Sequence, residues 1–265
     1  MITSLQNRHV KNIVKLLSNA RERRLQNRFV IEGVRELSMA LAGGYEFHSL
    51  YVCDELIDRV GEGLLCKLGD VPVEKVSADV FRKMAYREES DGIIAESSCR
   101  HLSLDGLYLS ANPLVIVLEA IEKPGNLGAV LRTADAAGVD AIIVCDPKTD
   151  IYNPNTIRSG IGCVFTQRIV VCNSEEARQW LKKKSIRIFA AALTASECYH
   201  NADFTQPAAI VLGSEADGLT DFWLGNADQH VKIPMHGHID SLNVSVSAAI
   251  MTFEAMRQRN CQKNK

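Results

Sequence analysis

Three loops in the second half of the chain combine glycine with polar or charged side chains, and each follows an apolar run. In the first loop, residues 119–138, Gly125 and Gly128 open an expected helix that carries Arg132. Glycines at a helix N-terminus suit an anion, and an arginine within that helix suits a phosphate group. The pattern is also typical of a structural turn, because a Gly-Asn turn often leads into a helix. A G-x-x-G spacing is too loose for a dinucleotide-binding fingerprint.

The second loop, residues 212–219, runs from an apolar strand directly into a glycine and an acid. Gly213 stands at the end of the expected strand, Glu215 follows, and Gly218 comes three residues later. A glycine at the end of a strand lets a ligand approach the backbone closely. A turn with a solvated glutamate explains the same residues, so this loop indicates a binding function only in combination with the others.

The third loop, residues 233–245, begins with a Pro-Met turn. Ser241 and Asn243 stand where a helix is expected to begin, and Ser241 alone could serve as its N-cap. His236 and His238 have the spacing of a metal pair, but no third ligand lies at a motif-like distance. We therefore expect these histidines to occupy a solvated loop, and we expect no metal site.

The elements that must position these loops alternate between short apolar runs and helical patterns. Continuous apolar strands separated by helices predict a parallel sheet covered on both faces, and such sheets bind ligands beyond the carboxyl ends of their strands. The last helical pattern, residues 242–259, is apolar on most sides in its first half, which predicts burial in a core or a subunit interface. The apolar runs lie at residues 114–118, 141–145, 168–172, 186–191, 208–213 and 230–234.

The chain is expected to hold two domains, with a boundary near residue 110. Residues 29–109 mix helical patterns with short apolar runs, which predicts a small α/β domain. The segment SLDGLYLSANP then has the composition of a linker, giving domains at residues 1–110 and 111–265. No apolar run approaches the about 20 residues that span a membrane, and the start lacks the apolar stretch of a signal peptide, so we expect a cytoplasmic protein.

The eight cysteines show no C-x-x-C spacing and no histidine at a zinc-ligand interval. We therefore expect neither a disulfide framework nor structural zinc. Cys145, in the apolar run AIIVC, has the surroundings of a small core residue and not of a nucleophile.

Positive charge is concentrated at the start of the chain. Within residues 1–28, seven basic side chains accompany one acid, Glu22, which gives this segment a charge of +6. Either the segment is a solvated helix face, or it is a phosphate-binding surface, which the interleaved Asn, Gln and Ser favour. A smaller basic cluster at residues 257–265 fits a frayed tail. The seven basic residues are Arg8, Lys11, Lys15, Arg21, Arg23, Arg24 and Arg28.

Taken together and in this order, the three loops resemble the SpoU (TrmH) family of RNA ribose 2′-O-methyltransferases within the SPOUT superfamily. The pattern N-x-G-x-x-x-R falls on Asn126, Gly128 and Arg132. The pattern G-S-E-x-x-G-L falls on residues 213–219, and I-P-M…S-L-N-V-S falls on residues 233–245. The resemblance covers residues 112–259. The earlier segments VKNIVKLL, RERRLQNRFVIEG and DGIIAE resemble the family's L30e-like RNA-binding domain.

The resemblance implies a small L30e-like α/β domain followed by a knotted parallel-sheet SPOUT domain, working as a homodimer on RNA with S-adenosylmethionine as cofactor. Ribosomal RNA is a more expected substrate than transfer RNA. The catalytic site would combine one subunit's first loop with the other subunit's cofactor, using Asn126, Arg132, Glu215, Ser241 and Asn243. The cofactor would be held by Leu212, Gly213, Gly218, Ile233, Met235 and Leu242. The RNA would contact Lys11, Arg21, Arg23, Arg24 and Arg28.

The chemistry implied by this resemblance needs alignment and the removal of one proton. A ribose hydroxyl is a poor nucleophile, whereas the methyl group of a sulfonium is already activated. Family accounts assign the proton to the arginine at position 132, but arginine, with a pKa above about 12, is not deprotonated in proteins. We expect Arg132 to clamp a phosphate and orient the ribose, and its role as the base stays open. Glu119 and Glu122 stand where many family members carry aspartate, a departure that we expect to be neutral.

Three other functions are alternatives to this interpretation. A nicotinamide-dependent oxidoreductase needs G-x-G-x-x-G after its first strand, and the chain contains no such motif. A conventional open-sheet methyltransferase is likewise expected to have a G-x-G loop at that point. A non-catalytic RNA-binding or ribosome-assembly protein that retains the fold is the more serious alternative, and the joint presence of the five candidate catalytic residues argues against it.

Overall fold

The computed structural model describes residues 1–214 and 216–263, with side chains as far as residue 260. It divides into two compact units, each described by itself. Unit 1 comprises Met1–Arg100 together with Asp150–Thr166. Unit 2 comprises His101–Thr149 and the chain from Gln167 onward. Residues 150–166 therefore pack in unit 1, although they follow the boundary expected near residue 110.

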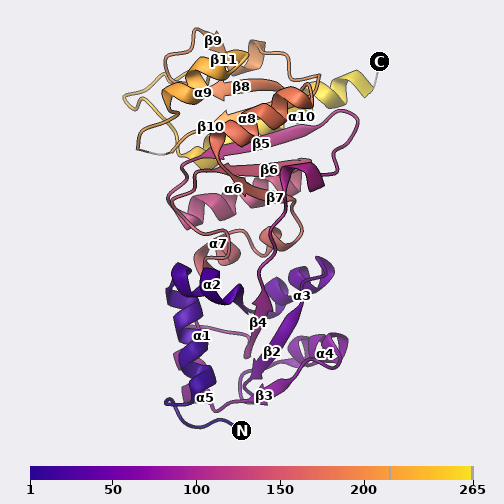
Figure 1. Ribbon diagram of the computed structural model, residues 1–265, viewed down its shortest axis with the longest axis vertical. Coiled ribbons are helices and arrows are strands. Elements are labelled where there is room, and N and C mark those ends of the chain that lie inside the picture. Colours follow the sequence, from indigo (N-terminus) through magenta and orange to yellow (C-terminus); the bar gives the residue numbers. More distant parts are fainter. Residues whose placement is uncertain (215, 264–265) are drawn as a thin grey trace. The chain divides into compact units, whose positions relative to one another are not determined.

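Unit 1 is an α/β unit whose described residues form a four-stranded sheet of order β1-β4-β2-β3. Figure 1 labels β2, β3 and β4 of this sheet. The central strand β4 runs antiparallel to β1 and β2, and β3 pairs with β2 in parallel. The strands are β1 (Arg28–Glu32), β2 (Phe47–Val52), β3 (Val73–Lys75) and β4 (Ile93–Ser98). The helices are α1 (Arg8–Ser18), α2 (Ala20–Gln26), α3 (Val34–Ala42), α4 (Arg59–Leu68), α5 (Ala78–Met84) and α7 (Pro154–Ser159).

The basic start of the chain folds into two consecutive helices because asparagines cap both of them. The side chain of Asn7 accepts the backbone N–H of His9 at the start of α1, and that of Asn19 accepts the N–H of Arg21 at the start of α2. The buried face of α1 joins the core of α5, while its other face carries the charged residues. The amphipathic pattern thus leaves basic side chains on the surface of unit 1.

An aromatic cluster ties residues 150–166 to the core of unit 1. Tyr152 stacks on Phe29 of β1, with ring centroids 4.2 Å apart. Phe165 stacks on Phe29 from 5.8 Å, and Tyr45 meets Tyr152 and Phe165 edge-on. Burial of four aromatic rings against one another is strongly stabilising, so this segment is part of the unit and not a surface loop.

Unit 2 contains, within the described residues, a seven-stranded sheet of order β7-β6-β5-β10-β8-β11-β9. All of its strand pairings are parallel, which confirms the predicted parallel-sheet fold. The strands are β5 (Leu114–Glu119), β6 (Ala141–Cys145), β7 (Ile169–Cys172), β8 (Arg187–Ala191), β9 (Glu197–Cys198), β10 (Ala208–Leu212) and β11 (Gln229–Lys232). The helices are α6 (Pro124–Ala137), α8 (Ser174–Lys183), α9 (Asp221–Asn226) and α10 (Val244–Lys263).

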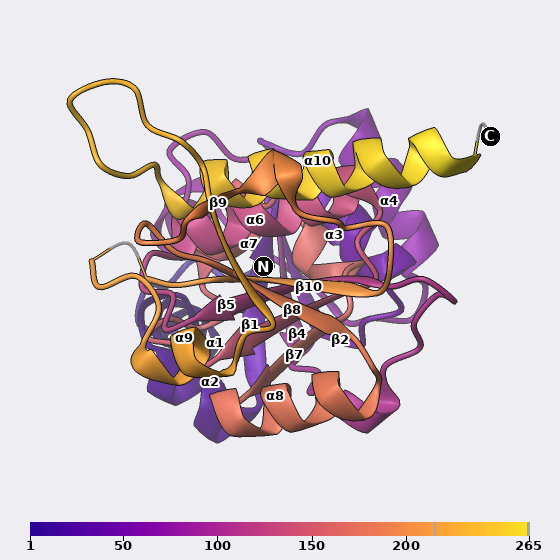
Figure 2. The same cartoon turned by 90° about the horizontal axis from the view of Figure 1, so that it is seen from above.

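Helices cover both faces of this sheet, as its continuous apolar strands require. Figure 2 shows α8 and α9 on one face, and α6 and α10 on the other. On the first face, Val115 and Val117 of β5 share a core with Trp180 of α8 and Trp223 of α9. Cys145 is fully buried in the same core, which confirms its interpretation as a core residue.

Helix α10 packs against α6 and β10 along one side. Val244, Ala248 and Met251 are buried there, whereas Val246 and Phe253 are 45% and 50% exposed. The first half of this helix was predicted to be buried. Within a single chain, only the side that faces α6 and β10 is buried. No helix among the described residues combines the length and the apolar character needed to cross a membrane.

Candidate active site

A cavity of about 390 Å³ opens at the carboxyl ends of β8, β10 and β11 in unit 2. Its wall consists of these strand ends, the loops that follow β10 and β11, and the first turns of α10. The volume lies within the range of small-molecule sites, which is about 300–1,000 Å³. The six residues that the family resemblance implies for cofactor binding all line this cavity: Leu212, Gly213, Gly218, Ile233, Met235 and Leu242.

The loop after β10 closes tightly on itself and so forms one wall of the cavity. Ser214 and Gly218 exchange two backbone hydrogen bonds of 3.1 Å each, and the Ser214 hydroxyl accepts the N–H of Asp217 at 3.1 Å. A side chain at Gly213 would place its Cβ 2.0 Å from the carbonyl carbon of Gly218. Only glycine allows this approach, which explains the residue at the end of the strand.

The third loop brings two of the candidate catalytic residues together. The side chain of Asn243 caps α10, accepting the N–H of Ser245 at 2.9 Å, so the cap is Asn243 and not Ser241. The Asn243 amide also donates to the side-chain oxygen of Asn126 at 3.2 Å, across 117 positions of sequence. Ser241 lines the cavity, and its hydroxyl donates to Asp240 at 3.4 Å.

Arg132, a fourth candidate catalytic residue, does not join this group within one chain. Arg132 is exposed on α6, does not line the cavity, and makes no hydrogen bond or ion pair with any described residue. Six positions separate it from Asn126, which is about 9 Å along a helix axis. Glu215 lies outside the described residues.

The cavity also contains side chains that the sequence analysis did not single out. Asp217 and Asp240 place carboxylates on its wall, and Val244 and Met251 add apolar surface from α10. These residues fit S-adenosylmethionine, because apolar side chains suit its adenine, backbone groups beside Gly213 suit its polar atoms, and carboxylates suit its positive sulfonium. Neither aspartate stood out in the sequence, because a lone acid in a loop is most often solvated.

His236 and His238 are exposed and lie outside the cavity wall. Across the described residues, no group of three or more potential ligands could hold a metal ion. Within the part of unit 2 that the structure describes, these two histidines thus contact neither the cavity nor a metal-binding group.

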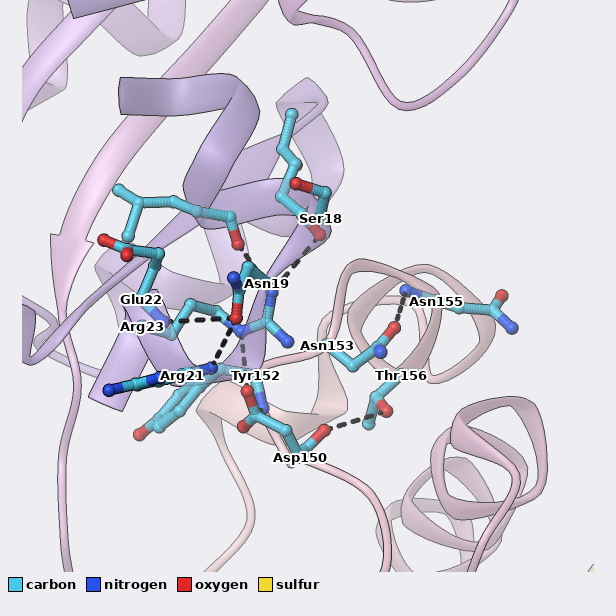
Figure 3. Close-up of polar contacts among 12 residues, drawn as sticks. Ser18, Asn19, Arg21, Glu22, Arg23, Asp150, Tyr152, Asn153, Asn155 and Thr156 are labelled. Atoms are coloured by element: carbon cyan, nitrogen blue, oxygen red, sulfur yellow. Dashed lines mark hydrogen bonds and ion pairs between the residues drawn. The ribbon is translucent and has the colours of Figure 1, made fainter. Parts of the chain in front are cut away.

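One of the candidate RNA contacts, Arg23, is a wrong prediction. Its side chain is 3% exposed and forms an ion pair of 2.6 Å with Asp150. Figure 3 shows the two side chains in contact. The same guanidinium donates to the carbonyls of Leu16 and Leu17 at the end of α1, at 2.5 Å and 3.2 Å. A buried charge needs such partners, so Arg23 joins α1, α2 and residues 150–156 and cannot reach a nucleic acid.

The remaining candidates for RNA contact differ in how freely they face solvent. Lys11, Arg21 and Arg24 are exposed on α1 and α2. Arg28 forms an ion pair of 2.6 Å with the buried Glu96, and its side chain is 40% exposed. Of the five residues expected to contact RNA, three therefore have exposed side chains, and a fourth, Arg28, is partly exposed but paired with Glu96.

Comparison with known proteins gives consistent matches over both units. A model of the SpoU rRNA Methylase family matches residues 113–253, and a model of the MRM3-like substrate binding domain matches residues 7–95. The 23S rRNA (guanosine(2553)-2′-O)-methyltransferase RlmP of Bacillus subtilis is 30% identical over 254 residues, which cover 95% of this chain and 97% of that protein. The 23S rRNA (guanosine-2′-O-)-methyltransferase RlmB of Vibrio parahaemolyticus is 39% identical over 199 residues, covering 73% and 81%.

Solved structures agree with this result. The crystal structure of an RNA 2′-O ribose methyltransferase superposes with a TM-score of 0.86 at 37% identity, covering 98% of this chain and 99% of that one. The SpoU methyltransferase AviRb from Streptomyces viridochromogenes, in complex with the cofactor AdoMet, superposes with a TM-score of 0.88 at 26% identity, covering 96% and 100%.

Proposed function

Since the chain belongs to the SpoU rRNA methylase family, and is thus an RNA 2′-O-ribose methyltransferase that uses S-adenosylmethionine, we propose that its substrate is structured ribosomal RNA. The support for this substrate is the match along nearly the whole chain to a protein named as a 23S rRNA methyltransferase. With ribosomal RNA as substrate, the enzyme acts in the compartment that holds the ribosome, which we propose is the cytoplasm.

The cavity at the ends of β8, β10 and β11 is the proposed site of S-adenosylmethionine. The observation that carries this assignment is the meeting of all six expected cofactor residues on one cavity wall. Apolar side chains such as Leu242 and Met251 would exclude water from the cofactor, while Asp217 and Asp240 would favour its positive charge. When bound, S-adenosylmethionine supplies a methyl group that its sulfonium already activates.

The residues of this chain are proposed to bind the cofactor and to orient the ribose toward it. The amide pair of Asn126 and Asn243 joins the first loop to the start of α10. This contact is proposed to fix the position of the ribose hydroxyl relative to the cavity, because a well-aligned attack accounts for a large part of the rate in such transfers. Ser241, on the cavity wall, offers a neutral hydrogen bond to the sugar or the cofactor.

Arg132 is proposed to act in the site of a second copy of the chain. It is exposed and lies outside its own chain's cavity, so a role in catalysis requires a partner protomer. The exposed Val246 and Phe253 of α10 provide apolar surface for a homodimer. There Arg132 would clamp an RNA phosphate with its planar fork of donors. We also propose that residues 111–265 form the knot that the family resemblance implies.

Residues 1–110 are proposed to bind the RNA substrate. The supporting observations are the match to a substrate binding domain and the exposed cations Lys11, Arg21 and Arg24. Neutralisation of phosphates by such side chains gives affinity without sequence specificity.

The experiment that tests the proposed substrate measures transfer of a labelled methyl group from S-adenosylmethionine to purified ribosomal RNA and, separately, to transfer RNA. Label in ribosomal RNA supports the proposal, and label confined to transfer RNA refutes it. Mapping 2′-O-methyl sites in cells that lack the protein then identifies the nucleotide. For the dimer, light scattering of Phe253→Asp should show a monomer that no longer transfers the methyl group, and a fully active monomer would refute the shared site.

A further inference from the structure

Glu119 is a buried carboxylate outside the cavity wall. It is the last residue of β5, an interior strand of the sheet, and is 4% exposed. Its Oε2 accepts the backbone N–H of Thr220 at 2.8 Å, and its Oε1 accepts the hydroxyl of Thr220 at 2.6 Å. Among the described residues, no lysine or arginine forms an ion pair with it. Both carboxylate oxygens thus bond to a single residue 101 positions away in the sequence.

This arrangement is specific, because a buried carboxylate without good partners is strongly unfavourable. The hydroxyl contact of 2.6 Å is at the short end of the range for O–H···O hydrogen bonds. Thr220 is also the N-cap of α9, but its side chain makes no capping hydrogen bond to that helix. The hydroxyl that would ordinarily cap the helix is directed at Glu119 instead.

Thr220 follows directly on the loop that forms one wall of the cavity. Gly218, two positions earlier, lines the cavity and exchanges backbone hydrogen bonds with Ser214. Leu219, between them, is buried. The contact of Thr220 with Glu119 therefore fixes the end of this loop against β5. The start of the loop is fixed because it follows directly on β10.

Helix α9 has a second, independent attachment beyond Thr220. The indole of Trp223, which is fully buried, donates to the hydroxyl of Ser174 at 3.1 Å. That hydroxyl in turn donates to Asp146 at 2.7 Å. Because this contact holds α9 on the sheet, loss of the bond between Glu119 and Thr220 should loosen the loop without releasing the helix.

We propose that Glu119 is a positioning residue for S-adenosylmethionine binding, acting through Thr220 to hold residues 213–219 in the shape that forms the cavity wall. The inference rests on the proposed assignment of the cavity to the cofactor. It also gives Glu119 a function at a position where the sequence comparison suggested only a neutral departure.

The test is the variant Thr220→Val, which keeps the shape and the backbone N–H of threonine but removes the hydroxyl. Loss of this buried hydrogen bond should weaken S-adenosylmethionine binding about tenfold. Calorimetry with S-adenosylmethionine alone measures this dissociation constant without turnover. In methyl transfer, the KM for the cofactor should rise by the same factor, while kcat at saturating cofactor stays within about twofold of the wild type. Thr220→Ser, which retains the hydroxyl, should restore wild-type affinity.

A matched control is Thr205→Val. The Thr205 hydroxyl and N–H likewise both donate to one carboxylate, that of Asp203, at 2.5 Å and 2.9 Å, but at a surface loop outside the cavity wall. This variant should bind S-adenosylmethionine as the wild type does. A lower melting temperature with wild-type affinity in Thr220→Val would overturn the inference, because Glu119 would then serve stability alone. Equal weakening by Thr205→Val would overturn it as well.

The variant Gly213→Ala separates this inference from the assignment of the cavity. Its methyl group would collide with Gly218 in the cavity wall. Wild-type affinity in Gly213→Ala refutes the cavity as the cofactor site and the inference with it. Weakened binding in Gly213→Ala combined with wild-type binding in Thr220→Val refutes only the role of Glu119.

Discussion

The buried ion pair of Arg23 and Asp150 predicts that Arg23→Met destabilises unit 1 without a direct effect on RNA binding. Removing one partner of a buried pair costs about 3–5 kcal/mol. The side chain of Asp150 remains 18% exposed and still accepts the N–H of Tyr152 at 2.9 Å, so part of its charge stays satisfied in the variant. We therefore expect the lower end of the range, a loss of about 3 kcal/mol of unfolding free energy.

The measurement must report on unit 1. Both tryptophans, Trp180 and Trp223, lie in unit 2, so tryptophan fluorescence would follow the wrong unit. Urea unfolding is therefore followed by far-ultraviolet circular dichroism, which detects both units, and tryptophan fluorescence recorded in parallel identifies the part of the transition that belongs to unit 2. In thermal unfolding, the same loss should lower Tm by about 6–12 °C for a chain of this size.

Arg24→Met is the matched control for this prediction, since Arg24 is exposed on the same helix. It should change stability by no more than about 0.5 kcal/mol, yet weaken RNA binding and flatten its salt dependence. Arg23→Met should leave the salt dependence unchanged under native conditions. Wild-type stability together with a flattened salt dependence in Arg23→Met would show that Arg23 contacts RNA after all.

Three further predictions concern the RNA surface, the arginine of α6 and the cysteines. Replacing Lys11, Arg21 and Arg24 by glutamine should reduce the slope of log affinity against log salt by about two to three, and an unchanged slope would leave these residues as a solvated face. Arg132→Lys should lower kcat about a hundredfold, because a point charge cannot replace the guanidinium fork, while the dissociation constant for S-adenosylmethionine stays within about twofold. Wild-type turnover in this variant would remove Arg132 from the mechanism. A hydrogen bond from Cys145 lowers the pKa of the Cys172 thiol, whereas burial raises the pKa of Cys99 to about 12. Because the thiolate is the reactive form, iodoacetamide at pH 8 should modify Cys172 before Cys99 in peptide mass spectrometry, and the opposite order would contradict the assigned environments.

The sequence predicted the parallel sheet of unit 2 because both faces of that sheet are covered. Strands such as β5 and β10 are then apolar throughout, and this pattern is visible without a structure. The two-residue strand β9 was missed, since a pairing so short leaves no periodicity. The six residues proposed to hold the cofactor could be named in advance because their loops carry family motifs. The glycine at position 213 also has a direct steric cause.

The sequence alone could not predict which polar residues contact each other across long separations in the chain. Nothing in the basic segment distinguishes Arg23 from Arg24, because only the packing of α2 on residues 150–156 buries one and exposes the other. In the same way, Glu119 reaches Thr220 only because β5 and β10 are neighbours in the sheet. Periodicity indicates which face of an element is apolar, but it does not identify the partner of a charge.

The return of residues 150–166 to unit 1 means that the chain passes from one unit to the other three times. A gene fragment ending near residue 100 would encode Phe29 without the ring of Tyr152 and Arg23 without its counter-ion. Such a fragment should aggregate on expression. A chimaera made by one crossover between two relatives would take Arg23 from one parent and Asp150 from the other. Any transfer of unit 1 to another protein therefore has to move the coding sequence for residues 1–100 and for residues 150–166 together.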